Sequence, residues 1–317
     1  MTLEDIRNFV AIAQAGSLVR AAQRLGLSQP TLSKSIARLE RTLRAQLVER
    51  HARGVRLTET GEVFLAHARK LDLGLQESLT AMRDLRQGVA GSVRFGVGMG
   101  VPQTLIAAAC KPLLAHRRLT LEISGGMSDS LFQAVASGDT EFAITGVRPP
   151  ESANLTWMPL FRDPMVPIAT REHRLANARR VTWQELARER WIVANVGTIT
   201  RAWFDQQFKR RGIEPPARLI GLRGYPPALE LGAALSAISL LPASFVRASP
   251  DVSQYCELRK PTDWRSDRTV GILYRPNGYL SAAARAVMES IATTSRKLFR
   301  EGAQSPDSLR DSTSFDC

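Results

Sequence analysis

The sequence lacks most features that indicate catalysis, metal binding or a disulfide-stabilised fold. Its three cysteines, Cys110, Cys256 and Cys317, are far apart and form no Cys-x-x-Cys pair. We therefore expect neither a disulfide framework nor a zinc site, which is typical of a protein in a reducing compartment. The four histidines are isolated along the chain, and neither a His-Glu-x-x-His nor a Walker sequence is present. The sequence thus predicts no enzymatic activity, no metal site and no cofactor.

Long apolar runs are also missing. The longest, residues 231–242, has 12 residues and ends in proline, which is too short to cross a bilayer. The first residues, Met1 to Asp5, include two acidic side chains and no basic ones, so they do not resemble a secretory signal. We expect a cytoplasmic protein that does not associate with membranes.

Acidic residues are scarce relative to basic ones. The chain has 43 Lys and Arg against 30 Asp and Glu, which gives a formal charge of +13. Residues 20–56 alone hold nine basic and two acidic side chains, a local charge of 9 − 2 = +7. Such a patch favours a polyanionic partner such as nucleic acid. Basic residues are also common on solvated helix faces, so charge alone leaves DNA binding undecided.

The first 40 residues have the pattern of three short helices. Apolar side chains spaced three and four apart predict a helix over residues 3–15, which ends at Gly16. Ser17 is placed as the N-cap of a second short helix. After a turn at Gly26, Ser28 is placed as the N-cap of a third helix, with Pro30 in its first turn. Helix, glycine-containing turn and helix at this spacing predict a helix-turn-helix.

The third helix has a polar face suited to DNA. If Leu32, Ile36 and Leu39 point inward, the outer face exposes short hydrogen-bonding groups and cations, which are needed at base edges and phosphates in a major groove. This exposed set is Gln29, Thr31, Ser33, Lys34, Ser35 and Arg38. We expect the base-reading group to be Gln29, Pro30, Ser33, Lys34 and Arg38, with Thr31 on a phosphate. The alternative is an ordinary three-helix cluster with a polar face.

A hairpin and a long helix follow. Residues 47–50 and 55–57 flank a basic tip that predicts a β-wing, where Arg53 would be attracted by phosphates. Residues 58–87 predict one long helix with Thr58 as a plausible N-cap. Its apolar side chains, which nearly follow a heptad seam, are Phe64, Ala68, Leu71, Leu75, Leu79 and Met82. Such a seam favours pairing of two subunits, although the helix can instead pack on its own domain.

Strands and helices alternate in the remainder of the chain. The predicted strands are residues 93–97, 119–124, 142–145, 165–169, 191–194, 219–222, 238–241 and 270–274, and the predicted helices include residues 103–115, 128–137, 200–211 and 279–299. This alternation predicts an α/β domain with largely parallel sheets. Gly88 and Gly91 mark its beginning, and the composition of residues 301–317 predicts a disordered tail.

Residues 3–65 resemble the LysR-type transcriptional regulators. The matching positions are Leu3, Phe9, Gly16-Ser17, Ala21-Ala22, Leu25, Ser28-Gln29-Pro30, Ser33, Ile36, Leu39-Glu40, Leu47, Arg50 and Leu57-Thr58-x-Thr60-Gly61. The sequence departs from the family at Arg44, where glycine is frequent, and at Val48, where phenylalanine is usual. The resemblance continues more weakly to about residue 295, for example in Gly91-Ser92-Val93-Arg94-Phe95-Gly96.

The resemblance implies an α/β, multi-domain architecture. It consists of a winged helix-turn-helix over residues 1–60, a linker and dimerisation helix over 61–90, and a two-lobed effector domain over 91–300 that is similar to type 2 periplasmic binding proteins. Lobe I would comprise about 91–162 and 267–300, and lobe II about 163–266.

The resemblance also places an effector cleft between the lobes. By matching positions, its lining would be Gly100, Val101, Pro102, Ser128, Thr145-Gly146 and Asn195 to Thr200, including Thr198. These segments follow strands and precede helices, where backbone N–H groups can receive an anionic ligand. The alternative for each hydroxyl residue is an ordinary helix cap.

We therefore expect a regulator that binds double-stranded DNA and is modulated by a small molecule, in particular a small organic acid. The resemblance implies a homodimer or homotetramer, and RNA polymerase is a further candidate partner. Two alternatives are an enzyme with an appended DNA-binding domain and an architectural DNA binder. The sequence identifies neither the effector nor the target genes, nor whether the outcome is activation or repression.

Overall fold

The structure is a computed structural model that describes residues 1–51, 54–87, 91–116, 119–249 and 252–299. The predicted phosphate contact Arg53 and the predicted tail, residues 301–317, lie outside the described residues. The chain divides into two compact units, the first of which is Met1–Leu85 and the second of which begins at Arg86. Each unit is described by itself.

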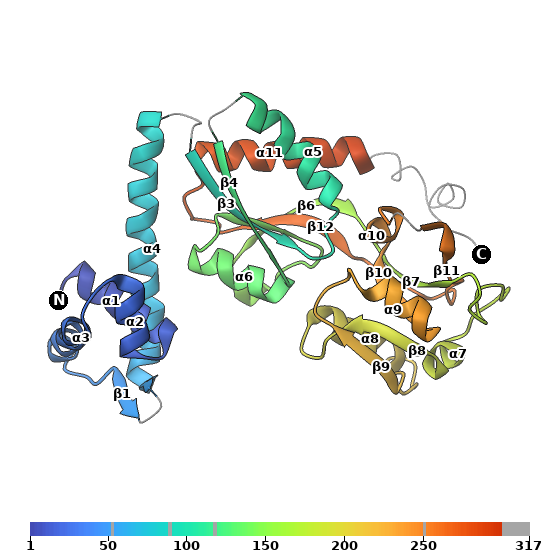
Figure 1. Ribbon diagram of the computed structural model, residues 1–317, viewed down its shortest axis with the longest axis horizontal. Helices are drawn as coiled ribbons and strands as arrows, with labels where there is room; N and C mark the ends of the chain where they lie inside the picture. The colour runs from blue at the N-terminus through green and yellow to red at the C-terminus, as the bar shows by residue number, and fades with distance from the viewer. Residues whose placement is uncertain (52–53, 88–90, 117–118, 250–251, 300–317) are drawn as a thin grey trace. The chain divides into compact units, whose positions relative to one another are not determined.

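The first unit contains three short helices, a hairpin and one long helix (Figure 1). Its elements are α1 (Leu3–Ala15), α2 (Leu18–Leu25), α3 (Gln29–Leu43), β1 (Val48–His51), β2 (Gly54–Leu57) and α4 (Glu59–Gln87). Hydroxyl side chains cap three of these helices, because Thr2, Ser17 and Ser28 each accept a backbone N–H. Gly16 and Gly26 end α1 and α2 with positive φ, which glycine adopts without strain.

The core of the first unit joins α1, α3 and the base of α4. Phe9, Leu32 and Leu39 are fully buried within it. Leu65 and Ala68 of α4 belong to the same cluster. The inward orientation that the sequence predicts for the apolar face of α3 is therefore confirmed.

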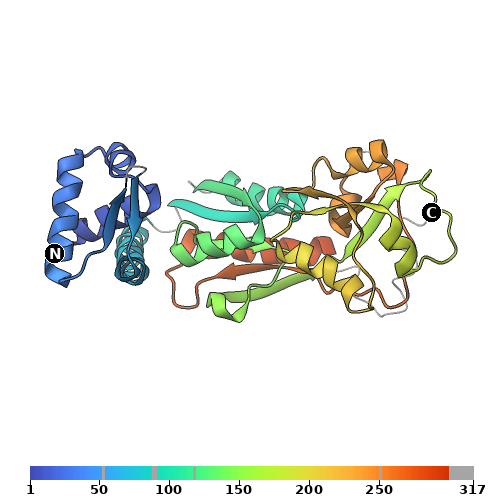
Figure 2. The same ribbon diagram turned by 90° about the horizontal axis from the view of Figure 1, so that it is seen from below.

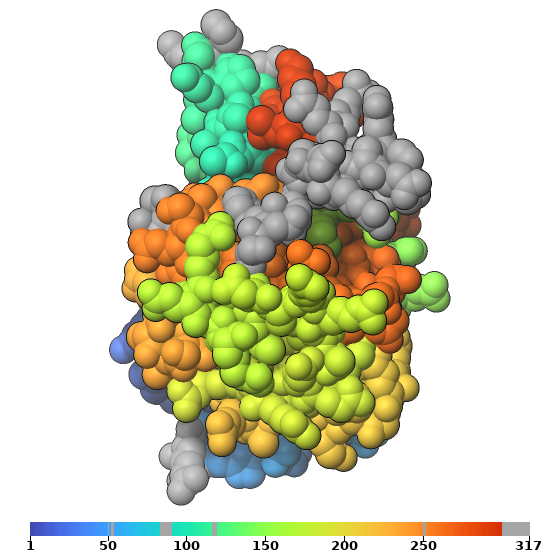
Figure 3. All heavy atoms as spheres, turned by 90° about the vertical axis from the view of Figure 1, so that its right-hand side faces the viewer, coloured from blue at the N-terminus to red at the C-terminus, as the bar shows by residue number. Residues whose placement is uncertain are grey.

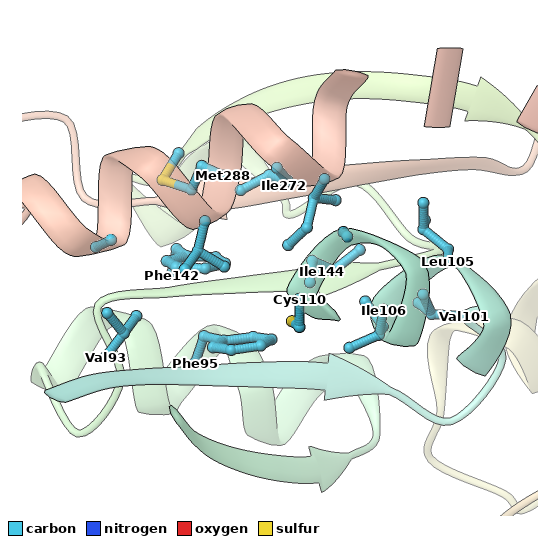
Figure 4. Packing of buried hydrophobic residues seen from close by; sticks show 14 of the residues in the cluster. Val93, Phe95, Val101, Leu105, Ile106, Cys110, Phe142, Ile144, Ile272 and Met288 are labelled. Atoms are coloured by element: carbon cyan, nitrogen blue, oxygen red, sulfur yellow. The ribbon is translucent and has the colours of Figure 1, made fainter. Parts of the chain in front are cut away.

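Two five-stranded sheets form two lobes in the second unit (Figure 2). Lobe I has the strand order β4-β3-β5-β12-β6. Its elements are β3 (Gly91–Gly98), α5 (Gln103–His116), β4 (Leu119–Gly126), α6 (Ser128–Ser137), β5 (Phe142–Thr145), η1 (Glu151–Ala153), β6 (Thr156–Arg162), β12 (Thr269–Tyr274) and α11 (Ala282–Phe299). Helices α5 and α11 cover one face of the sheet and α6 covers the other. Figure 4 shows Phe95 and Phe142 within this core, and their rings stack with centroids 5.0 Å apart.

Lobe II has the strand order β11-β7-β10-β8-β9. Its elements are β7 (Met165–Thr170), α7 (Trp183–Arg188), β8 (Arg190–Ala194), α8 (Ile199–Lys209), β9 (Arg218–Leu222), α9 (Ala228–Leu235), β10 (Ile238–Pro242), α10 (Ala243–Arg247), η2 (Val252–Gln254) and β11 (Tyr255–Glu257). Helices α7 and α8 pack on one face, and α9 and α10 on the other. Figure 3 looks onto lobe II and shows the yellow-green segment after β7 across the middle of this face.

Each sheet is mixed, so the prediction of largely parallel sheets is only half right. In lobe I, β3 is parallel to β4 and β5, whereas β12 is antiparallel to β5 and β6. In lobe II, β8 is parallel to β9 and β10, whereas β7 is antiparallel to β10 and β11. The antiparallel strands arise because the chain crosses between the lobes twice, from β6 into β7 and from β11 into β12.

Two further sequence expectations are tested by the structure. Cys110 is a free, buried thiol in the core of lobe I. Burial raises the pKa of Cys110. Among the described residues, no helix combines the length and the apolar character that a bilayer crossing requires.

Candidate DNA-binding surface and effector cleft

The first half of α3 presents polar side chains outward. Gln29, Pro30, Thr31 and Lys34 are exposed, and Ser33 is half-buried. Ser28 accepts the backbone N–H of Thr31 at 3.3 Å, and the hydroxyl oxygens of these two residues lie 2.8 Å apart. The side chains of Gln29, Thr31 and Lys34 therefore face outward, which is the arrangement that a recognition helix requires.

Two other residues of α3, Ser35 and Arg38, have partners within the first unit. Ser35 is only 1% exposed, and its hydroxyl accepts a hydrogen bond from Asn8 Nδ2 at 2.9 Å. Arg38 donates from Nε and Nη2 to Oδ1 of Asp5, at 3.1 and 2.5 Å. The expectation that Ser35 faces DNA is therefore wrong. Arg38 is exposed, as predicted, and binds the protein's own Asp5, so its contact with DNA stays a prediction.

The Asp5–Arg38 pair clamps α3 onto α1. Asp5 is fully buried, whereas the Arg38 side chain is 48% exposed. The hydrogen bonds from Arg38 hold the pKa of the Asp5 carboxyl well below its usual range. This pair helps to hold α3 against α1. No sequence pattern signals it, because helical periodicity does not reveal which partner a long side chain reaches.

The β1–β2 hairpin is attached to the end of α1. The two strands pair antiparallel from Val48–Leu57 to His51–Gly54. Val55 donates its backbone N–H to the carbonyl of Gly16 at 2.9 Å. A Cβ on Gly54 would lie 2.3 Å from the same oxygen, and its φ is +138°, so a larger residue does not fit there. The wing is thus held in a defined position beside the three helices.

A cavity that opens to solvent lies between the two lobes of the second unit, and the empty space in and around its mouth is about 320 Å³. Its lining is Gly98, Met99, Gly100, Gly126, Met127, Ser128, Gly146, Val147, Thr200, Tyr225 and Arg268. Four of these residues are glycines at the ends of strands, so backbone groups replace side chains in much of the wall. A second cavity of about 190 Å³, inside lobe II, has an apolar lining and shares only Tyr225 with the first.

The structure brings some of the predicted effector residues to this cavity and not others. Gly100, Ser128 and Thr200 line it. Val101 and Pro102 are instead buried, and Val101 belongs to the core of lobe I. Thr145 is fully buried and donates its hydroxyl to the carbonyl of Val147 at 2.7 Å. These three residues lie at or just after strand ends, but they are buried and are not among the lining residues of the cavity.

Two predicted residues at the start of α8 act as structural caps. Thr198 accepts the backbone N–H of Arg201 at 3.2 Å and donates its hydroxyl to the carbonyl of Asn195 at 2.8 Å. Neither Asn195 nor Thr198 is among the lining residues of the cavity. The capping alternative for Thr198 is therefore the one that the structure supports.

Sequence reasoning missed two lining residues, Tyr225 and Arg268. Burial raises the pKa of the Tyr225 hydroxyl. Arg268 donates from Nη1 to Oδ2 of Asp163 at 2.5 Å and from Nη2 to the carbonyl of Gly100 at 2.9 Å. The Arg268 side chain is 9% exposed, and Asp163 is fully buried. No motif marks either residue, because both reach the cavity from the connections between elements.

Comparison with known families matches both units. The model described as "Bacterial regulatory helix-turn-helix protein, lysR family" matches residues 3–62, and the "LysR substrate binding domain" matches residues 86–296. The second match alone covers most of the chain. The chain belongs to the LysR family of transcriptional regulators. It is thus a DNA-binding regulator with an effector-binding domain rather than an enzyme.

Individual relatives of this LysR-type regulator match over three quarters of its length or more. The transcriptional regulator GbpR of Azospirillum brasilense is 27% identical, over 96% of this chain and 90% of the relative. CfxR of Cupriavidus necator is 30% identical, over 76% of this chain and 75% of the relative. Among solved structures, ArgP from Mycobacterium tuberculosis has a TM-score of 0.65 at 18% identity, covering 93% of this chain and 97% of that one. A full-length OxyR variant from Pseudomonas aeruginosa has a TM-score of 0.64 at 24% identity, covering 93% and 95%. These structures share the fold.

Proposed function

We propose that the chain regulates transcription by inserting α3 into the major groove of promoter DNA, in response to a small organic acid held between the lobes of the second unit. In this assignment residues 1–60 bind DNA, residues 61–90 pair subunits and residues 91–300 bind the effector. One observation carries the DNA-binding part: Gln29, Thr31 and Lys34 are exposed on α3, while Leu32 and Leu39 on its opposite face are buried.

The chemistry of the exposed residues supports a division of roles. Gln29 has the amide that pairs with adenine in a major groove. Lys34 supplies a cation, and Thr31 supplies a hydroxyl for a phosphate. Ser33, Pro30 and Arg38 contribute to the position of these groups. CbnR, a LysR-family regulator with a TM-score of 0.50 to this chain, has been solved in complex with its target DNA.

Exposed apolar side chains on α4 support assembly into dimers and, through a second contact, tetramers. Leu71, Leu79 and Met82 are 52%, 43% and 58% exposed, although all three belong to the predicted seam. Apolar side chains on one stripe of a long helix are stabilised by pairing with a second helix. A dimer would present two copies of α3 to the two halves of a palindromic site.

The cavity supports the effector part of the proposal. Ser128 and Thr200 place hydroxyl groups on its wall, Gly100 leaves room for a ligand, and Arg268 adds a positive charge. A small anion that can also accept and donate hydrogen bonds fits this lining.

Salt titration of promoter binding tests the DNA-binding part. Lys34→Ala should weaken binding to a fragment from the region upstream of the chain's own gene. It should also reduce the slope of log affinity against log salt by about one, since one cation that displaces counterions from the DNA is lost. Lys70→Ala is the matched control, because it removes an exposed lysine of the same unit from α4. Identical salt slopes for wild type and Lys34→Ala would contradict the proposed placement of α3.

A further inference from the structure

Arg268 occupies a distinctive position in the cavity between the lobes. Among the described lining residues, it is the one with a permanently charged side chain. It lies on the connection from β11 to β12, and its partner Asp163 lies on the connection from β6 to β7. The pair therefore joins the two crossings between the lobes. The backbones pair as well, because Asp163 donates its N–H to the carbonyl of Arg268 at 3.0 Å.

The partners of this guanidinium differ in how firmly they hold it. Asp163 is fixed in lobe II, since its carboxylate accepts the backbone N–H of Ser244 at 2.9 Å and the hydroxyl of Ser244 at 2.6 Å. The guanidinium also donates to the neutral carbonyl of Gly100, in the loop that leads from β3 into α5. A hydrogen bond to a carboxylate is stronger than one to a neutral carbonyl. The Gly100 contact is thus the one that an incoming anion can replace.

The donor inventory also leaves room for a ligand. A guanidinium carries five N–H groups in a planar fork. Contacts with Asp163 and Gly100 use three of them, two from Nη1 and one from Nη2. The fork lies against Gly146, where a Cβ would be 2.1 Å from Nη2. The backbone of Gly146 therefore packs directly against the guanidinium, and both residues line the cavity.

We propose that Arg268 determines the charge of the effector: it binds the carboxylate of a small organic acid, which replaces the carbonyl oxygen of Gly100, while Asp163 holds the guanidinium in place. The inference rests on the proposed function, because it assigns the ligand of the same cavity. Binding of the acid releases the loop before α5 from Arg268. The effector's charge is thereby coupled to lobe I through Gly100 and to lobe II through Asp163 and Ser244.

The test measures the binding of paired acids and amides to the full chain by titration calorimetry. The probes are acetate, propionate, lactate, pyruvate and benzoate, each with its primary amide, which has nearly the same size but no charge. We expect at least one acid to bind about tenfold or more tightly than its amide, because a charge-assisted hydrogen bond is lost in the amide. The double variant Arg268→Met, Asp163→Asn should remove this preference.

Two single variants make the test specific. The double variant removes both charges, so it leaves no unpaired carboxylate in the protein interior. Asp163→Asn alone leaves Arg268 without its counter-charge and should increase the preference for the acid. Arg265→Met is the matched control, because Arg265 is an exposed arginine on the same connection and does not line the cavity. It should bind acids and amides as the wild type does.

The outcomes separate the inference from the function on which it rests. The role of Arg268 is overturned if the double variant keeps the preference for the acid, or if the amides bind the wild type as tightly as the acids. Either result is still compatible with an effector in this cavity. Failure of every probe to bind the wild type overturns both the acid-sensing function and this inference.

Discussion

At the scale of single residues, the buried carboxylate of Asp5 has a dominant structural role in the DNA-binding unit. It accepts hydrogen bonds from the backbone N–H of Thr2 at 3.0 Å and from the guanidinium of Arg38. The hydroxyl oxygen of Thr2 in turn accepts the backbone N–H of Asp5. One residue thus caps α1 and positions α3. Arg38 thereby links α3 to α1.

Removal of the Asp5 carboxylate should destabilise the first unit. We expect Asp5→Ala to reduce the free energy of unfolding by about 1–3 kcal/mol, because the capping box loses its bond to the Thr2 N–H and the Arg38 guanidinium loses its acceptor. Chemical denaturation monitored by circular dichroism measures the change. Glu4→Ala is the control, since Glu4 is an exposed acidic residue in the same turn. A loss no larger than that of Glu4→Ala would show that the clamp contributes little.

The free energy of unfolding of the first unit should also depend on pH. The pKa of Asp5 is lower in the folded chain than its ordinary value of 3.8, which the unfolded chain restores. The resulting stabilisation is complete above about pH 5 and is lost as the pH falls through 3.8 toward the folded pKa. Denaturation of wild type and Asp5→Asn between pH 6 and pH 3 should show converging stabilities at the acidic end. Parallel curves over this range would contradict the assignment.

The cavity gives a further prediction for a single residue. A Cβ on Gly146 would lie 2.1–2.3 Å from three guanidinium atoms of Arg268, so Gly146→Ala should displace that side chain. We expect a loss of about 1–3 kcal/mol in unfolding free energy from the overpacking. Gly125→Ala is the control, because its Cβ would meet only Met99 Sδ at 3.8 Å. Equal thermal stability of the two variants would show that Arg268 relocates without cost.

At the scale of elements, the sequence predicted helices better than strand pairing. Helix α6 and strand β5 have the predicted bounds, because each is a short apolar pattern between glycine-rich or polar segments. Strands β6 and β11 were not predicted. Both are edge strands, and β6 contains Pro159, which an edge strand tolerates and which breaks the usual strand pattern. Edge position is a property of the whole sheet, so local sequence does not show it.

Several residues that were predicted to line the cleft are buried and do not line the cavity. The positions after β3 and β5 were found, but Val101 and Thr145 turn into the core. Backbone alternation places residues near a strand end without fixing which of them faces a ligand. Arg268 was missed because a lone arginine on a connection has no periodicity. Its role becomes visible only when two crossings, more than 100 residues apart, are brought together.

The exposed stripe on α4 makes a prediction for the element. Leu71→Ser combined with Leu79→Ser should raise the dimer dissociation constant by about tenfold or more, because the burial of two leucines is lost. Sedimentation equilibrium measures this constant. The control is Val63→Ser, a residue of the same helix that is 59% exposed and lies outside the seam. Unchanged self-association of the double variant would place the subunit contact elsewhere.

At the scale of the whole molecule, each unit has the contents of an independent fold. The first has its own cluster of buried residues around Phe9 and Leu32. The second contains both sheets and the remaining clusters, including the aromatic core of lobe II around Trp191 and Phe204. Separate cores are the basis for separate cooperative unfolding.

This separation predicts how a ligand acts on stability. Calorimetric melting of the full chain should show two transitions, and an acid that binds the cavity should raise only the transition of the second unit. At a ligand concentration of 100 times the dissociation constant, the stabilisation should be about 2.7 kcal/mol. Promoter DNA should instead raise the melting transition of the first unit.

A fragment of residues 86–300 should bind the acid with an affinity within about twofold of the full chain, because the cavity lining belongs entirely to that unit. A fragment that melts without cooperativity, or a ligand that shifts both transitions equally, would mean that the units fold as one.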